Sequence, residues 1–335
     1  GEDTHGNPER NKKESNFLHD FEYKPTPNLP YPTCGINKGL HLQGTDPISL
    51  LDYSFLSTLA YYEPSVTQPA LNNWFGNGTA VSDQSTVDTF KRSQDSISPV
   101  SYKLISFDVG NETLGVVSIR GTQDPWDVFV DVQLWSAAVL TQIFRAILPF
   151  GHIWTPIFDE LVYLSSRFGS KSLEKISFYK ETTKFVKHIE KNFTRLQLTG
   201  HSLGGGLAII SGAQTQTSTV AVSGPNAMIS RLTFEPALTK EQLNTYTFNI
   251  VPKRDPVPML DDLAALYQKI NCSAPNNEIG GCHNPERSLC EIMVNCGTGP
   301  RPAICDCAKL YGYPEPDQIG NRTFEEACKY VNHGF

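Results

Sequence analysis

The spacing of apolar positions changes from one segment of the chain to the next. Between residues 48 and 63 apolar side chains recur every three or four positions, which predicts an amphipathic helix. Residues 102–107 and 114–120 are short apolar runs separated by a polar turn, which is typical of two strands. Residues 1–40 are mostly polar and rich in proline, so we expect an extended N-terminal arm there.

The second half of the chain alternates helical and strand patterns. The spacing predicts helices at 180–192, 203–213 and 239–245, and strands at 195–199, 218–224 and 246–251. Strands that alternate with helices indicate a mostly parallel sheet with helices on both faces. We therefore expect an α/β domain over residues 41–335.

A predominantly apolar segment lies between these two regions, at residues 123–165. From Val132 to Phe158 its only charged side chain is Arg145, apart from protonation of His152. Proline and glycine residues divide the segment into two or three short helices. Such a segment could be ordinary core, a lid over a binding site, or a surface element that enters lipid.

Composition and charge exclude some classes of function. The chain has 335 residues, of which 39% are hydrophobic, so it can bury a sizeable core. Its net charge is −7, which gives no electrostatic basis for binding nucleic acid, and we expect no nucleic-acid partner. The sequence contains no uncharged apolar stretch of the length that a transmembrane helix requires.

The cysteines point to an oxidising compartment. Of the 8 cysteines, seven lie in a cysteine-rich tail at residues 270–335, and the other is Cys34. Paired C-x-x-C knuckles are missing, so we favour disulfides over a zinc site and expect no metal. N-x-S/T sequons lean towards the secretory route and begin at Asn77, Asn111, Asn192, Asn271 and Asn321. We expect a secreted or lumenal protein.

One serine lies in a motif with chemical meaning. The sequence Gly-His-Ser-Leu-Gly at 200–204 follows a predicted strand and precedes a predicted helix of small residues. This is the context in which G-x-S-x-G forms a nucleophile elbow, a tight turn that exposes the serine oxygen at the edge of a sheet. Ser202 is therefore the candidate nucleophile. The alternative is an ordinary loop serine.

A serine nucleophile needs a base, and the base needs an acid that orients it. In this type of fold the order along the chain is serine, acid, histidine. Asp255 directly follows a predicted strand, whereas Asp261 and Asp262 are expected to cap a helix. His283 and His333 are the histidines that come after such an acid, and we favour His283 because a disulfide at Cys282 could hold its loop. His201 is interpreted as a packing or hydrogen-bonding residue.

These motifs together resemble the lipase class 3 family, the fungal-lipase-like α/β-hydrolases. The matching pieces are GHSLGG at 200–205, VVSIRGT at 116–122, NIVPKRDPVP at 249–258 and LSTLAYYE at 56–63. The resemblance covers roughly residues 45–260 and implies an α/β-hydrolase fold with a helical lid or insertion. The short spacing between Asp255 and His283 and the glycine at position 206 depart from the family pattern.

The resemblance also implies roles for individual residues. Ser202, Asp255 and His283 would form the triad, and an oxyanion hole would use Thr122 and the backbone N–H of Leu203. The segment after the RGT motif would form the lid, with Trp126, Phe129 and Trp135 as candidate lipid contacts.

The residues predict a serine hydrolase that cleaves carboxylic esters of phospholipids or acylglycerols and requires no cofactor. Its partner would be a lipid substrate at an interface, with transient contact with a membrane surface. Two alternatives are an esterase for acyl groups on polysaccharides and a hydrolase fold that only binds its ligand.

Overall fold

The computed structural model describes residues 48–94, 100–109, 111–121, 178–278, 280–298 and 301–314. The predicted arm, the whole apolar segment 123–165 and the end of the chain lie outside the described residues.

The described strands form one seven-stranded sheet, in the order in which they occur along the chain. The first two pairs of neighbours are antiparallel and the other four are parallel, so the predicted mostly parallel sheet is confirmed. The strands are β1 (Ala80–Ser82), β2 (Tyr102–Val109), β3 (Glu112–Ile119), β4 (Arg195–His201), β5 (Ser218–Val222), β6 (Thr247–Pro252) and β7 (Tyr267–Ile270).

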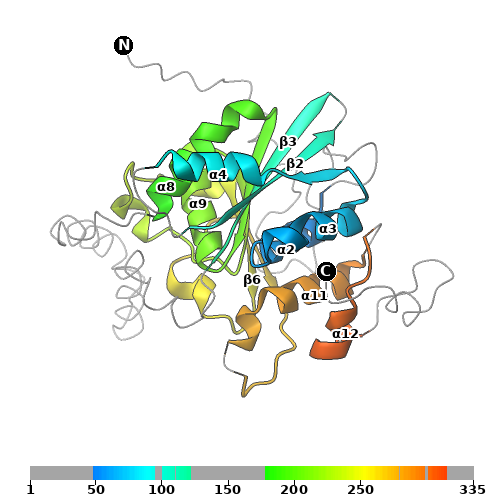
Figure 1. The fold of residues 1–335 in the computed structure, drawn as a ribbon. Helices are drawn as coiled ribbons and strands as arrows, with labels where there is room; N and C mark the ends of the chain where they lie inside the picture. The colour runs from blue at the N-terminus through cyan, green and yellow to red at the C-terminus, as the bar shows by residue number, and fades with distance from the viewer. Residues whose placement is uncertain are drawn as a thin grey trace, which may run out of the picture.

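The strand order determines which face the connecting helices cover. Consecutive parallel neighbours joined by right-handed crossovers place their helices on the same face of a sheet. One apolar cluster accordingly joins the sheet to α8 (Phe178–Ile189), α9 (Leu203–Thr215) and α10 (Lys240–Tyr246), together with α4 (Gln84–Arg92). Figure 1 shows α4, α8 and α9 on one side of the sheet.

The opposite face is covered by helices from both ends of the described chain. These helices are α2 (Leu50–Leu59), α3 (Pro64–Phe75), α11 (Pro285–Cys296) and α12 (Cys305–Tyr311). Every residue of α2 is buried, because α2 packs against the sheet and also contacts α11. Figure 1 shows these four helices together on the side away from α8. Helices therefore cover both faces, as predicted.

The predicted elements agree with those observed to within a few residues. The helix expected at 180–192 is α8 followed by the 3-10 turn η4 (Glu190–Asn192). The strand expected at 195–199 continues to His201, and the helix after Ser202 continues to Thr215. The helix expected at 239–245 is α10, and the Thr239 side chain caps its N-terminus. None of the described helices is long and apolar enough to cross a membrane.

Disulfides stabilise the C-terminal region internally, and a buried ion pair joins it to α2. One disulfide joins Cys272 to Cys282 and another joins Cys290 of α11 to Cys307 of α12. These four cysteines are therefore not zinc ligands, and the prediction of disulfides is confirmed for them. Arg301 donates to Asp52 of α2 over Nε–Oδ1 and Nη2–Oδ2 distances of 2.8 and 3.2 Å.

The expectation that Asp261 begins a helix is wrong. Asp261 has an extended backbone after the 3-10 turn η6 (Val257–Leu260), and its carboxylate is fully buried. It accepts hydrogen bonds from the N–H groups of Ile229 and Ser230, at 2.7 and 3.0 Å, at the start of the 3-10 turn η5 (Ser230–Thr233). Burial raises the pKa of Asp261 to about 6, against the opposing effect of these donors.

This raised pKa predicts a pH-dependent stability difference between the wild type and the Asp261→Asn variant. A group whose pKa is higher in the folded state favours folding at low pH and loses that contribution as the pH rises through the folded pKa. The free energy of unfolding of the wild type, relative to the variant, should therefore fall by about 2–3 kcal/mol between about pH 4 and pH 7. Urea unfolding at both pH values measures it, and a difference that is independent of pH would contradict the account.

Candidate active site

Ser202 lies on a strained turn between β4 and α9. Its φ is 59° and its ψ is −133°, a backbone conformation that residues with a Cβ rarely adopt. The turn is held by hydrogen bonds from the Ser202 N–H to the Val222 carbonyl and from the Gly206 N–H to the Ser202 carbonyl, both 3.1 Å. The predicted strand-to-helix turn is therefore present.

Two glycines of the motif allow the close approach of β4, α9 and β3 around this turn. A Cβ on Gly200 would lie 2.5 Å from the carbonyl oxygen of Gly204, and a Cβ on Gly204 would lie 2.2 Å from that of Ile119. Both contacts are with backbone atoms, so a side chain at either position would move the helix or a strand. The glycine spacing thus reflects packing around the serine.

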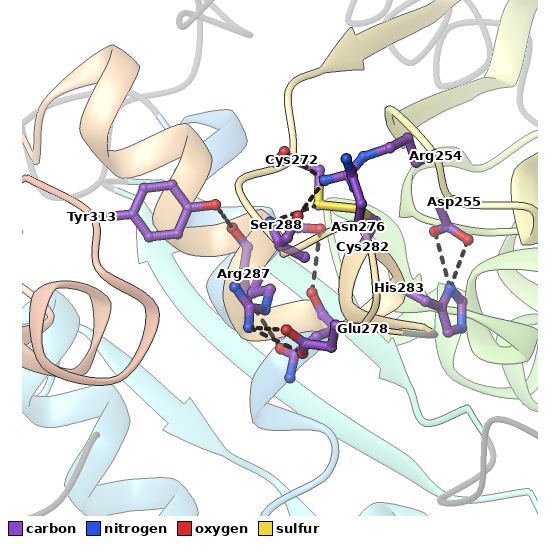
Figure 2. Close-up of a disulfide and its surroundings, with 12 residues drawn as sticks. Arg254, Asp255, Cys272, Asn276, Glu278, Cys282, His283, Arg287, Ser288 and Tyr313 are labelled. Carbon is purple, nitrogen blue, oxygen red and sulfur yellow. Dashed lines mark hydrogen bonds and ion pairs between the residues drawn. A yellow bond between two sulfur atoms is a disulfide. The ribbon is translucent and has the colours of Figure 1, made fainter.

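The structure brings Ser202, His283 and Asp255 into one hydrogen-bonded chain. The Oγ of Ser202 lies 2.8 Å from the Nε2 of His283. The Nδ1 of His283 lies 3.1 and 3.0 Å from the two carboxylate oxygens of Asp255. All three residues are buried, with exposed fractions of 7% or less. Figure 2 shows the contact between His283 and Asp255.

The hydrogen bonds of Asp255 favour one arrangement of protons. A carboxylate accepts hydrogen bonds, so the Nδ1 of His283 carries the proton that Asp255 binds, and Nε2 is left to accept the hydroxyl proton of Ser202. The N–H of Val257 donates to Asp255 Oδ1 over 3.0 Å and helps to fix the carboxylate. This is the arrangement that a general base needs.

His283 occupies a short 3-10 turn, η7 (Gly281–His283), rather than a strand end. The preceding residue, Cys282, forms the disulfide with Cys272, as the sequence suggested. The following residue, Asn284, caps α11 by accepting from the N–H groups of Glu286 and Arg287. The histidine is therefore fixed on one side by a disulfide and on the other by a helix N-terminus.

Of the two expected oxyanion donors, the described residues include Leu203 but not Thr122. Leu203 is the first residue of α9, where a backbone N–H has no partner inside the helix and can serve an anion beside Ser202. Thr122 lies outside the described residues, although its neighbour Gly121 is described. The candidate lipid contacts Trp126, Phe129 and Trp135, and the alternative base His333, also lie outside them.

His201 is a hydrogen-bonding residue, as predicted. Its Nε2 lies 2.7 Å from the backbone carbonyl of His283 and its Nδ1 lies 2.9 Å from the hydroxyl of Tyr61. Burial lowers the pKa of His201 well below its ordinary value, and the nearby His283 lowers it further, so the ring is neutral. Its Nε2 therefore donates to the carbonyl, and its Nδ1 accepts from Tyr61.

Tyr61 is a residue of the site that sequence reasoning did not single out. Its hydroxyl also accepts from the backbone N–H of Gly121, the residue before Thr122. Burial raises the pKa of Tyr61, so the hydroxyl stays protonated and can donate to His201. Tyr61 and His201 thereby connect the end of β3 to the backbone of His283. The LSTLAYYE motif contains Tyr61, but sequence alone does not show this contact.

Comparisons with known proteins identify a family that part of the chain resembles. Residues 116–263 match the sequence model of the lipase (class 3) family, so the resemblance to this family is confirmed over that segment. The segment runs from β3 past β6 and contains Ser202 and Asp255, whereas His283 lies beyond its end. The mostly parallel sheet with helices on both faces is the α/β fold class that the sequence predicts, and the family match supports an ester hydrolase.

Solved structures of lipases overlap with this chain at low identity. Lip2 lipase from Yarrowia lipolytica is 16% identical, with 67% of this chain and 78% of that chain covered and a TM-score of 0.34. The lipase from Rhizopus microsporus var. chinensis is 14% identical, with 74% and 86% covered and a TM-score of 0.35. M37 lipase is 17% identical, with 62% and 69% covered and a TM-score of 0.33. No curated protein sequence matches the chain significantly.

Removal of the Tyr61 hydroxyl should slow ester hydrolysis. Tyr61→Phe leaves the buried Nδ1 of His201 and the N–H of Gly121 without this partner. A buried polar group left unpaired costs about 1–3 kcal/mol of folding stability. We expect kcat to fall about tenfold with KM nearly unchanged, because the groups beside the reacting atoms shift while substrate contacts elsewhere do not. Steady-state kinetics on a soluble ester measures both constants.

Tyr179→Phe is the matched control for this prediction. The Tyr179 hydroxyl is also buried and accepts a backbone hydrogen bond, from Glu235, but it contacts none of the triad residues. This variant should lose stability and keep its kcat. A Tyr61→Phe variant with wild-type kcat would contradict a role of Tyr61 in the site.

Proposed function

We propose that this protein hydrolyses carboxylic esters of lipids through an acyl-enzyme on Ser202. The observation that carries the proposal is the unbroken chain of hydrogen bonds from Ser202 Oγ through His283 to Asp255, which begins at a strained turn. The match to the lipase (class 3) family supports the same chemistry. Ser202 follows β4 and Asp255 lies on the loop after β6. One strand, β5, separates β4 from β6 in the sheet.

The proposed mechanism gives a direction to each proton. His283 takes the hydroxyl proton of Ser202 through Nε2 as Oγ attacks the ester carbonyl, and then gives that proton to the departing alcohol. A water molecule, deprotonated by the same nitrogen, then attacks the acyl carbonyl. The bond between the acyl group and Ser202 Oγ breaks, His283 returns the proton to Oγ, and the fatty acid leaves. Asp255 orients the ring and stabilises its charged form throughout.

The negative charge that develops on the carbonyl oxygen needs donors that are already in place. The N–H of Leu203 at the start of α9 is one such donor, and Thr122 is proposed as the second. Each oxyanion donor contributes about 3 kcal/mol to transition-state stabilisation in enzymes of this type. The hydrogen bond between Tyr61 and the backbone of Gly121 would help to fix the residue next to Thr122.

The substrate class is proposed as phospholipid or acylglycerol presented at an interface. The apolar sequence of 123–165, with Trp126, Phe129 and Trp135, supports a lid or a transient contact with a membrane surface. Opening of such a lid would be favoured at an interface that buries its apolar area.

The disulfides fit a protein of the secretory route, and we propose a secreted or lumenal glycoprotein. The described sequon asparagines are all exposed, at Asn77, Asn111, Asn192 and Asn271. Exposure is what attachment of a glycan requires.

A fluorophosphonate probe tests the proposed nucleophile. The wild type should become covalently labelled, because the phosphonate phosphorus is attacked by an activated serine, and Ser202→Ala should not be labelled. Ser85, an exposed serine at the start of α4, provides the control, and Ser85→Ala should label like the wild type. Mass spectrometry of the labelled peptide identifies the modified residue.

Two results would contradict the proposal. Labelling that persists in Ser202→Ala would place the nucleophile elsewhere. A folded wild type that never labels, with or without detergent micelles, would support a hydrolase fold that only binds its ligand. For a protein that does label, the acid released from phospholipid, acylglycerol and acetylated polysaccharide identifies the ester class.

A further inference from the structure

The residue before Asp255 makes contacts that the proposed reaction does not use. Arg254 has φ 68°, in the left-handed region that residues with a Cβ seldom occupy. Its guanidinium donates to the Asn276 side-chain oxygen over 2.6 Å, and to the backbone carbonyls of Cys272 and Ala274 over 3.0 and 2.5 Å. Figure 2 shows Arg254 extended towards Cys272 and Asn276, while Asp255 points to His283.

The segment to which Arg254 donates, from Cys272 to Asn276, leads along the chain to His283. Its described residues 271–278 form turns rather than helix or strand, so no ladder of backbone hydrogen bonds fixes them. The disulfide between Cys272 and Cys282 closes the segment into a loop, and His283 is the next residue along the chain. On its other side, Glu278 pairs with Arg287 of α11 over 2.7 Å.

These contacts form a closed ring of interactions around the acid and the base. The ring runs from Asp255 to Arg254, through the guanidinium to Cys272, across the disulfide to Cys282, and on to His283. The hydrogen bond between His283 and Asp255 closes it. Movement of the loop relative to Arg254 would therefore change the contact between His283 and Asp255.

We propose that Arg254 is a positioning residue that sets the placement of His283 through the disulfide-closed loop 272–282. This inference rests on the proposed function, since it assigns His283 the role of base. The sheet fixes Asp255 at the end of β6, but His283 follows a loop and has no strand to place it. The N–H groups of the Arg254 guanidinium donate to two backbone carbonyls and an amide oxygen of this loop, and these bonds restrict its position in place of a strand.

The chemistry of the contact favours arginine over other cations. Guanidinium donates from several N–H groups in one plane, whereas an ammonium on a lysine stem cannot reach three acceptors with the same geometry. Arg254 is exposed, so these bonds contribute little to global stability. Their effect should therefore appear in turnover and in local loop motion rather than in the melting temperature.

The test compares Arg254→Gly with the wild type. Glycine adopts φ 68° without strain, so this variant removes the guanidinium and keeps the backbone. On a soluble ester we expect kcat to fall about tenfold, KM to stay within about twofold and the melting temperature to change little. Arg254→Lys should recover part of the kcat. Lys253→Gln, which removes the neighbouring exposed cation, should behave like the wild type.

Hydrogen exchange provides a readout that does not depend on activity. Amide exchange of the peptide that contains residues 272–284 should speed up about tenfold in Arg254→Gly and remain at the wild-type rate in Lys253→Gln. In the Cys272→Ser/Cys282→Ser background, Arg254→Gly should cost less kcat than in the wild type, because the path to His283 is already broken.

The outcomes separate this inference from the proposed function. If the wild type has no esterase activity but amide exchange rises in Arg254→Gly, the role of Arg254 in holding the loop is supported and the proposed function fails. If the wild type is active and Arg254→Gly matches it in both kcat and amide exchange, the proposed positioning role of Arg254 is overturned. A fall in melting temperature with unchanged kcat would assign Arg254 a role in stability alone.

Discussion

The site depends on the strained backbone of Ser202. A φ of 59° at a residue with a Cβ is unfavourable on its own, and it persists only where the surrounding structure leaves no alternative. Here β4 is hydrogen-bonded on both sides, and α9 begins at the very next residue. The chain must reverse within one residue, and the glycines at 200 and 204 let the backbones come close enough for it to do so. The result is a hydroxyl fixed at the edge of the sheet.

The second requirement, a base beside that hydroxyl, is met by different means. Asp255 follows β6 and is placed by the sheet, but His283 comes from a cysteine-rich region that contributes helices to the opposite face. A disulfide, the cap of α11 and the contacts of Arg254 replace a strand in holding it. Tyr61 and His201 then connect the histidine backbone to the end of β3. The serine and the acid are thus placed by the sheet, and the base is placed by local contacts.

This difference explains what the sequence could predict. The elbow is visible in sequence because steric crowding limits which residues fit within a few positions, and the parallel sheet is visible through the alternation of helical and strand patterns. Asp255 follows from its place after a strand. By contrast, Asp261 accepts hydrogen bonds from Ile229 and Ser230, about 30 positions away, so the expectation that it begins the next helix was wrong. The contacts of Tyr61 and Arg254, and the pairing of the cysteines, are also distant in sequence and follow from the folded chain alone.

The choice of base is the point at which the account is most directly tested. Kinetics on a soluble ester should be compared for His283→Ala and His333→Ala, the two late histidines that the order of triad residues allows. Removal of the base from a serine triad typically costs at least about 10⁴-fold in kcat. The account predicts a loss of that size for His283→Ala and an unchanged kcat for His333→Ala. Full activity in His283→Ala would contradict it.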